Sequence, residues 1–161
     1  MAVAPRRGGI RHVSQPIATG IPVSHLHLVW ADLWPLLEPA YALSREKADI
    51  LAGLQDRRFQ AWAVYDTCGN SARRPIAAIV TRIWRDTETG ETDCRLWLVG
   101  GCRAHEWLPD FIAKVSTWAR IEGCTRLTAG GRRGWWPLVR AYGGHRIADE
   151  DGSQAWALEI R

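Results

Sequence analysis

The apolar pattern becomes regular only after a first stretch that glycine and proline keep irregular. Residues 1–22 contain Gly8, Gly9, Pro16, Gly20 and Pro22, which predicts an irregular N-terminal arm. From Val23 to Val29 apolar residues alternate loosely, which indicates a first strand.

The next segment has apolar residues at helical spacing. Asp32 is a suitable cap for a helix that runs to Ala42, and Pro39 is expected to bend or shorten it. Ser44 is the expected cap of a second helix, whose apolar stripe is Ala48, Ile50, Leu51 and Leu54.

The period changes to that of strands at Phe59. Strand-forming residues predict strands at Phe59–Tyr65, Ile76–Arg85 and Asp93–Val99. The polar segment Cys68–Arg74 and the run Thr87–Gly90 are expected to be the two connecting turns. Three consecutive antiparallel strands are therefore predicted.

The last part of the chain returns to a mixed pattern. A strong 3.6-residue stripe predicts a long helix over 105–122, which Gly123 should end. A short strand, a short helix and two final strands are then expected, at 126–129, 134–142 and within 145–161.

This order of elements defines the expected fold class. It is α/β (α+β), with a mixed, mostly antiparallel central sheet and helices on both faces. The expected organisation is a basic irregular arm, 1–22, followed by a single domain, 23–161.

The charge distribution and the tryptophan content both indicate a surface that contacts a partner. Ten tryptophans in 161 residues are too many for one small core, so some are expected at a surface. The net charge of +4 is uneven, because Arg6, Arg7 and Arg11 precede the first acidic residue, Asp32. Such an arm suits an acidic protein surface or a phosphate backbone.

Cysteine spacing and hydropathy indicate a reduced protein inside the cell. None of the four cysteines forms a C-x-x-C pair or completes a zinc pattern with histidine, so we expect no metal. No apolar run is long enough to cross a bilayer. We therefore expect a cytoplasmic protein, or a virion component if a phage encodes it, with no membrane partner.

The element order resembles that of the GNAT N-acetyltransferase family over residues 23–161. Four local runs resemble a subset of GNAT-like proteins that phages and prophages encode: Trp34-Pro-Leu-Leu-Glu-Pro-Ala, Asp49-Ile-Leu-Ala-Gly-Leu, Arg95-Leu-Trp-Leu-Val-Gly-Gly and Trp118-Ala-Arg-Ile-Glu-Gly-Cys. The resemblance implies an acetyl-CoA site between the strand that ends near Val99 and the long helix.

The implied coenzyme loop departs from the family pattern, Arg/Gln-x-x-Gly-x-Gly/Ala. Counted from Val99, the family glycines fall on about His105 and Trp107, whose side chains should obstruct the phosphates. If acetyl-CoA binds, the expected contacts are the strand backbone and the start of the helix, at Leu98, Val99, Gly100, Arg103 and Ala104.

The implied catalytic acid is also displaced. The family places a tyrosine in the last short helix, and here Arg140 holds that position while Tyr142 lies two residues later. Tyr142 is the candidate acid, and Asp93 and His145 are the candidate bases.

A basic aromatic loop follows the strand 126–129. Arg132, Arg133 and Trp135 lie among glycines there, a combination that suits a protein or nucleic-acid surface. With the basic arm, this loop is the expected partner-binding region.

Two functions remain open. The favoured one is a GNAT-fold protein with a degenerate acetyl-CoA loop and no cofactor, acting as a non-catalytic protein-interaction or virion-associated module. The alternative is an active acetyl-CoA-dependent N-acyltransferase, because amine attack needs few fixed side chains once the reactants are positioned. Nucleic-acid binding is a weaker third possibility.

Overall fold

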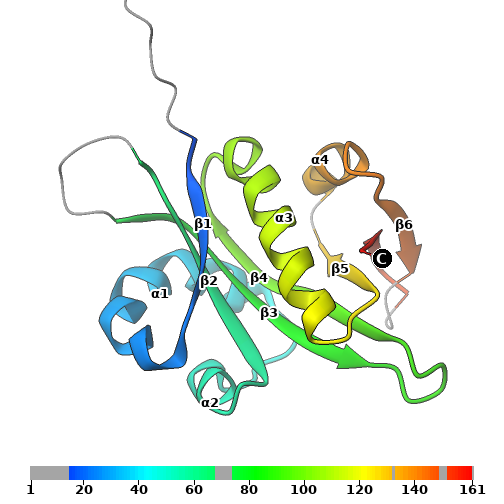
Figure 1. Ribbon diagram of the computed structural model, residues 1–161, viewed down its shortest axis with the longest axis horizontal. Coiled ribbons are helices and arrows are strands. Elements are labelled where there is room, and N and C mark those ends of the chain that lie inside the picture. The colour runs from blue at the N-terminus through cyan, green and yellow to red at the C-terminus, as the bar shows by residue number, and fades with distance from the viewer. Residues whose placement is uncertain (1–14, 68–73, 132, 149–151, 161) are drawn as a thin grey trace, which may run out of the picture.

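The computed structural model describes residues 15–67, 74–131, 133–148 and 152–160. Those residues form a seven-stranded sheet (Figure 1) with the order β1-β2-β3-β4-β5-β7-β6. The strands are β1 Ile17–Ile21, β2 Phe59–Tyr65, β3 Pro75–Arg85, β4 Thr92–Gly101, β5 Arg126–Gly130, β6 His145–Ala148 and β7 Gln154–Glu159. The helices are α1 Leu26–Leu43, α2 Ile50–Gln55, α3 Ala104–Ile121 and α4 Trp136–Arg140, with 3-10 turns η1 Val23–His25 and η2 Arg133–Trp135.

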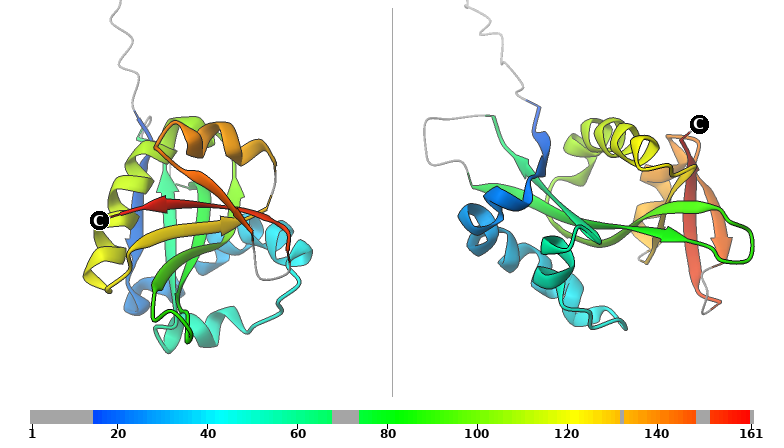
Figure 2. Two further views of the ribbon diagram at one scale, coloured as in Figure 1. Left: turned by 90° about the vertical axis from the view of Figure 1, so that its right-hand side faces the viewer. Right: turned by 60° about the horizontal axis from the view of Figure 1, so that its bottom comes forward.

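The helices lie on both faces of this sheet (Figure 2). Helices α1 and α2 cover one face, where Leu33 and Leu37 pack with Val80 and Leu98. Helices α3 and α4 cover the other, whose core includes Trp62, Phe111, Val115, Leu127 and Val139. Every pair of neighbouring strands is antiparallel except β4 and β5. The predicted mixed, mostly antiparallel sheet with helices on both faces is confirmed.

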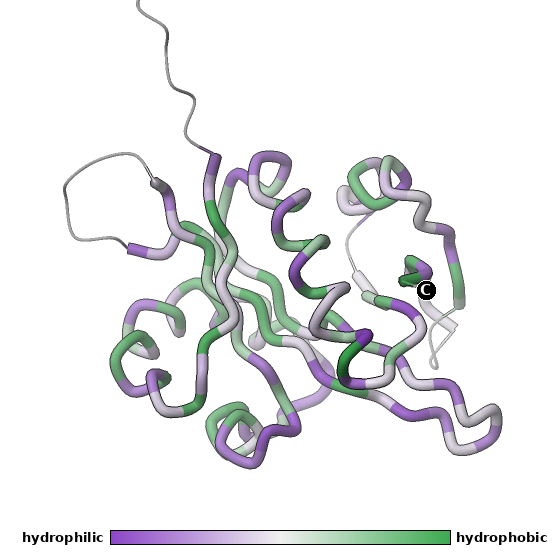
Figure 3. Tube along the Cα trace, viewed as in Figure 1, coloured by the Kyte–Doolittle hydropathy of each residue, from purple (hydrophilic) through white to green (hydrophobic). Residues whose placement is uncertain are grey.

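Helix α3 is the clearest amphipathic element, with polar and apolar residues alternating around its axis (Figure 3). Its buried stripe contains Trp107, Leu108, Phe111, Ile112, Val115 and Ala119. Gly123 has a φ of +83° and follows the helix, as the sequence predicts. The Cys124 N–H then donates to the Ala119 carbonyl at 2.8 Å and closes the helix end.

The first strand lies earlier than predicted. β1, Ile17–Ile21, falls inside the segment expected to be irregular, and the expected strand Val23–Val29 is helical instead. β1 is an edge strand whose free side is satisfied by α3, since the Ala18 N–H donates to Asp110 and the Ala18 carbonyl accepts from Lys114. These partners are more than 90 residues away in sequence. The local sequence pattern therefore does not predict β1.

The second helix also begins later than predicted. α1 continues through Pro35 and Pro39 to Leu43, so Pro39 does not shorten it. Ser44 ends α1 instead of opening α2, and the cap of α2 is Asp49, whose carboxylate accepts from the Ala52 N–H at 3.0 Å. Both residue types are good caps, and the spacing alone did not separate them.

Candidate functional site

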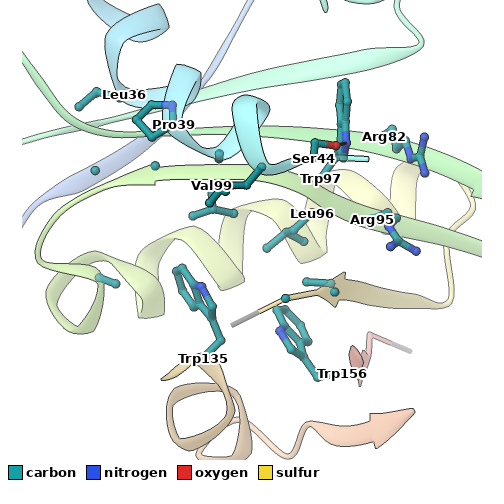
Figure 4. Close-up of a pocket in the computed structure, with 18 of the residues that line it drawn as sticks. Leu36, Pro39, Ser44, Arg82, Arg95, Leu96, Trp97, Val99, Trp135 and Trp156 are labelled. Atoms are coloured by element: carbon teal, nitrogen blue, oxygen red, sulfur yellow. Dashed lines mark hydrogen bonds between the residues drawn. The ribbon is translucent and has the colours of Figure 1, made fainter. Parts of the chain in front are cut away.

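A groove opens in the middle of the sheet where β4 and β5 separate. The two strands pair only from Asp93 to Arg95, opposite Arg126 to Thr128, although β4 continues to Gly101. Beyond the pairing lies a cavity of about 740 Å³. Residues of α1, β3, β4, α3, β5 and η2 line it (Figure 4). Cavities of this size hold small ligands or peptide segments in many proteins.

A bulge in β4 stands at the entrance to this groove. Thr81 pairs with Leu96 and Val80 with Leu98, so Trp97 is the additional residue between them. The Trp97 indole packs against the Phe59 ring at 5.1 Å between centroids, and its N–H donates to the Ser44 hydroxyl at 3.2 Å. The bulge therefore fixes one wall of the groove to the end of α1.

Three more tryptophans form the opposite wall. Trp107, Trp135 and Trp156 all line the groove, and Trp135 and Trp156 extend toward it from below β4 in Figure 4. Trp107 is buried, and its indole N–H donates to the Cys102 carbonyl at 2.8 Å. Trp135 is half-buried, with its ring 6.5 Å from that of Trp107.

The expectation that some tryptophans lie at a surface is confirmed, since Trp84 is 44% exposed. Several others are half-buried.

The glycines at the end of β4 serve packing. A Cβ on Gly100 would lie 1.7 Å from the Leu36 carbonyl oxygen, so α1 touches the β4 backbone at this point. Gly101 has a φ of +117°, and a Cβ there would lie 2.3 Å from the Ile76 oxygen. Both glycines line the groove, but the helix and the neighbouring strand explain why glycine is required.

The N-terminus of α3 carries its own carboxylates. Arg103, the residue before the helix, forms ion pairs with Asp66 and with Glu106 in the first turn. Its Nε donates to Glu106 at 2.9 Å. These hydrogen bonds raise the pKa of Arg103, and the bond from Arg103 lowers the pKa of Glu106. Two carboxylates therefore face the Arg103 guanidinium at the start of α3.

The two positions matched to the family glycines, His105 and Trp107, lie in a helix and not in a loop. α3 begins at Ala104, so His105 and Trp107 lie inside the helix and the connection from β4 is only Cys102 and Arg103. The His105 side chain is 72% exposed, and the Trp107 ring lies in the core against Phe111. Neither side chain is the obstacle that the pattern suggested.

The other predicted coenzyme contacts divide between groove and core. Val99, Gly100 and Ala104 line the groove. Leu98 is buried in the core below α1.

Asp93 lies in a closed ion pair. It is 9% exposed, and its two oxygens accept from Arg126 at 2.7 and 3.0 Å across the β4–β5 pairing. This bidentate bond raises the pKa of Arg126. Asp93 is not among the described residues that line the groove, and the geometry indicates that it joins the two strands.

The two tyrosine-position candidates, Tyr142 and Arg140, lie outside the groove. Tyr142 is 36% exposed in the turn after α4, and its backbone N–H donates to the Val139 carbonyl at 3.0 Å. Arg140 is exposed at the end of α4. Neither is among the described residues that line the groove, so the geometry does not favour Tyr142 as an acid there. His145, the other candidate base, is exposed at the start of β6.

The predicted partner-binding residues fall in different places. Arg6, Arg7, Arg11 and Arg132 lie outside the described residues. Arg133 is exposed in η2. Trp135 contributes to the groove wall.

Sequence reasoning missed the charged residues of the groove. Arg45, Glu46, Arg82 and Arg95 all line it. Glu46 pairs with Arg82, whose guanidinium also lies 5.8 Å from the Trp97 ring. One feature of the sequence indicates a charged site here. Arg82 shares a strand face with apolar residues, and a charged side chain in such a position needs an ion-pair partner.

Metal ligation and membrane crossing receive no support from the described residues. Among them, no three histidine, cysteine or acidic side chains come together as a metal site. No helix in that part of the chain combines the length and apolar character needed to cross a membrane.

Comparison with known proteins rests on structure. No protein-family model matches the sequence, and no curated protein matches it. The structure is similar to a chain of the NatC complex bound to Gag peptide and CoA, with a TM-score of 0.65 at 11% identity over 91% of this chain and 99% of that one. It is also similar to the ribosomal-protein-S18-alanine N-acetyltransferase of Escherichia coli, with a TM-score of 0.56 at 13% identity over 90% and 94%.

The chain has the GNAT acetyltransferase fold. A third similar structure is FeeM, an N-acyl amino acid synthase from uncultured soil microbes, with a TM-score of 0.61 at 8% identity over 92% of both chains. At these identities the likeness establishes the fold alone, and the chemistry must be argued from the groove itself.

Acetyl-CoA fits this GNAT groove in volume but not in charge. A cavity of about 740 Å³ is present, which is large enough for an acyl-pantetheine chain. A diphosphate needs open amides and positive charge at a helix N-terminus. Here the carboxylates of Asp66 and Glu106 are already paired with Arg103, the cation at that helix terminus. The residues present do not fit the diphosphate.

Proposed function

We propose that this chain is a non-catalytic binding module built on the GNAT fold, which engages another protein and uses no coenzyme. The observation that carries the proposal is the ion-pair cluster of Arg103, Asp66 and Glu106 at the start of α3. A diphosphate placed there would meet two carboxylates at short range, and like charges in one site weaken binding.

The groove also offers little chemistry for acetyl transfer. Its described lining contains no histidine, cysteine or tyrosine, and its one carboxylate, Glu46, is paired with Arg82. Transfer to an amine needs a group that accepts the amine proton and one that returns a proton to the thiolate. The predicted candidates, Asp93 and Tyr142, are not among the described residues that line the groove.

A virion assembly is one setting in which such a module would act. That setting rests on the resemblance to phage-encoded proteins and stays a prediction, as does nucleic-acid binding through the basic arm.

The second candidate is an N-acyltransferase, which the volume and position of the groove favour. An enzyme that holds its coenzyme mainly through the strand backbone of β4 would need few of the missing side chains. It would still have to displace Glu106 from Arg103 to hold a diphosphate.

An acetyl-transfer assay separates the two candidates. Purified protein is incubated with radiolabelled acetyl-CoA and three amine classes: a polyamine, a peptide with a free N-terminus and a free amino acid. The proposal predicts transfer at the spontaneous rate for all three. Transfer above that rate to any amine, together with its loss in Ala104→Trp, which adds bulk to the groove lining at the start of α3, would establish the enzyme instead.

A further inference from the structure

The main chain of β4 is open toward the groove. Within the described part of the chain, β4 runs to Gly101, but its pairing with β5 ends at Arg95. The remaining segment, Leu96–Gly101, spans about 20 Å at the usual rise of a strand. Its N–H and C=O groups on the β5 side need hydrogen-bond partners. An extended polypeptide supplies alternating donors and acceptors at the spacing of a strand.

The side chains on the two sides of this edge are mainly apolar. Leu36 and Pro39 lie on the α1 side of β4, and Trp135 and Trp156 lie on the opposite side (Figure 4). Leu43, at the end of α1, also lines the groove and is 72% exposed. The side chains of an extended occupant point alternately to the two sides. Apolar side chains at those positions would remove both surfaces from water.

Each charged side chain in the described lining of the groove already has a partner. Glu46 forms an ion pair with Arg82. Arg45 and Arg95 each interact with another group of the protein. At the start of α3, which borders the groove, Arg103 is paired with two carboxylates. A charged occupant would have to break one of these pairs or be buried without a counter-charge, and both weaken binding. The lining therefore selects an uncharged occupant.

We propose that the groove binds an uncharged, extended polypeptide segment as an added strand along Leu96–Gly101 of β4. This inference rests on the proposed function, since it names the partner chemistry of the same site. The segment carries apolar side chains at alternate positions, which pack against the indoles of Trp135 and Trp156. Side chains that point the other way lie against the end of α1.

Calorimetry with three capped octapeptides tests the charge preference. Each alternates valine with a second residue, which is threonine, glutamate or lysine. The uncharged peptide is expected to bind at least about tenfold more tightly than either charged one. If either charged peptide binds as tightly as the uncharged one, the proposal is overturned.

Two matched leucine variants test the position of the peptide. Leu43→Gln removes an apolar side chain from the groove lining and should weaken the uncharged peptide by about fivefold. Leu28→Gln is the control, because Leu28 is 67% exposed on the same helix and is not among the described residues that line the groove. Both leucines are exposed, so neither change should impair folding, which circular dichroism checks. Equal affinities of the two variants would overturn the proposed site.

Main-chain methylation tests the strand. Two further versions of the uncharged peptide are N-methylated at alternate residues, one version in each register. In an added strand, only one of the two sets of N–H groups faces β4. Loss of binding in one version and retention in the other therefore supports strand addition. Equal binding of the two versions overturns it.

A parallel titration with acetyl-CoA keeps the two proposals apart. If neither the peptides nor acetyl-CoA binds, the peptide inference is overturned and the proposed function without a coenzyme stands. If the uncharged peptide and acetyl-CoA both bind with micromolar Kd, the peptide inference stands and the proposed function is overturned. If only acetyl-CoA binds, both are overturned.

Discussion

Direct backbone contact between Gly100 and Leu36 joins α1 to the strand that borders the groove. The helix carbonyl lies so close to the strand that even a methyl group has no room. Such contacts cannot relax by moving a flexible side chain, because both partners are main chain.

Gly100→Ala is therefore expected to lower the free energy of unfolding by at least about 3 kcal/mol. Gly134→Ala is the matched control, since nothing lies within 4 Å of a Cβ there. Urea denaturation followed by circular dichroism measures both variants. A Gly100→Ala protein as stable as the control would contradict the contact.

Two buried thiols give the fold a pH dependence at the alkaline end. Burial raises the pKa of Cys94, and burial also raises that of Cys124 from 9.0 to about 11. The unfolded chain ionises first as the pH rises, so stability is complete below pH 8 and falls through the range 9 to 11. Each thiol contributes a slope of up to about 1.4 kcal/mol per pH unit.

The double variant Cys94→Ala, Cys124→Ala should show a flatter decline in unfolding free energy between pH 8 and 10.5 than the parent. Cys102→Ala, which removes an exposed thiol, should keep the parental slope. Denaturation curves at five pH values measure this. If the unfolding free energy of the parent and the double variant fell equally with pH, the buried thiols would not cause the pH dependence.

At the scale of elements, the proposed absence of a coenzyme rests on the start of α3. Its partial positive charge is compensated within the chain by Glu106 in the first turn. Removing that carboxylate, together with Asp66, frees Arg103 for an external anion.

Glu106→Gln with Asp66→Asn should raise the affinity for CoA by about tenfold or more over the parent. Glu122→Gln, which removes one carboxylate at the other end of α3, should have no such effect. Competition with a fluorescent CoA analogue measures the three proteins. An equal gain in Glu122→Gln would mean that overall charge, and not the α3 terminus, governs binding.

The elements also differ in how far sequence could predict them. β2, β3, β4 and α3 are defined by their own periodicity, so their positions followed from local pattern. β1 and the start of α2 depend on distant partners or on a choice between two good caps. Local pattern placed β1 in the wrong segment for this reason.

At the scale of the whole molecule, the sheet divides where β4 leaves β5, and the groove results. Sequence predicted the fold because element order restricts the topology. It could not predict the groove lining, because Arg45, Arg82 and Trp156 come from three separate segments. It placed a coenzyme contact at Arg103 without the two carboxylates that surround it, one of them 37 residues earlier.

The proposed account combines the GNAT fold with ion-paired carboxylates at the start of α3, where a diphosphate would otherwise bind. Isothermal titration of the unmodified protein with acetyl-CoA tests this account most directly. The predicted result is no detectable heat of binding up to about 1 mM coenzyme. Saturable binding with a micromolar Kd would contradict it.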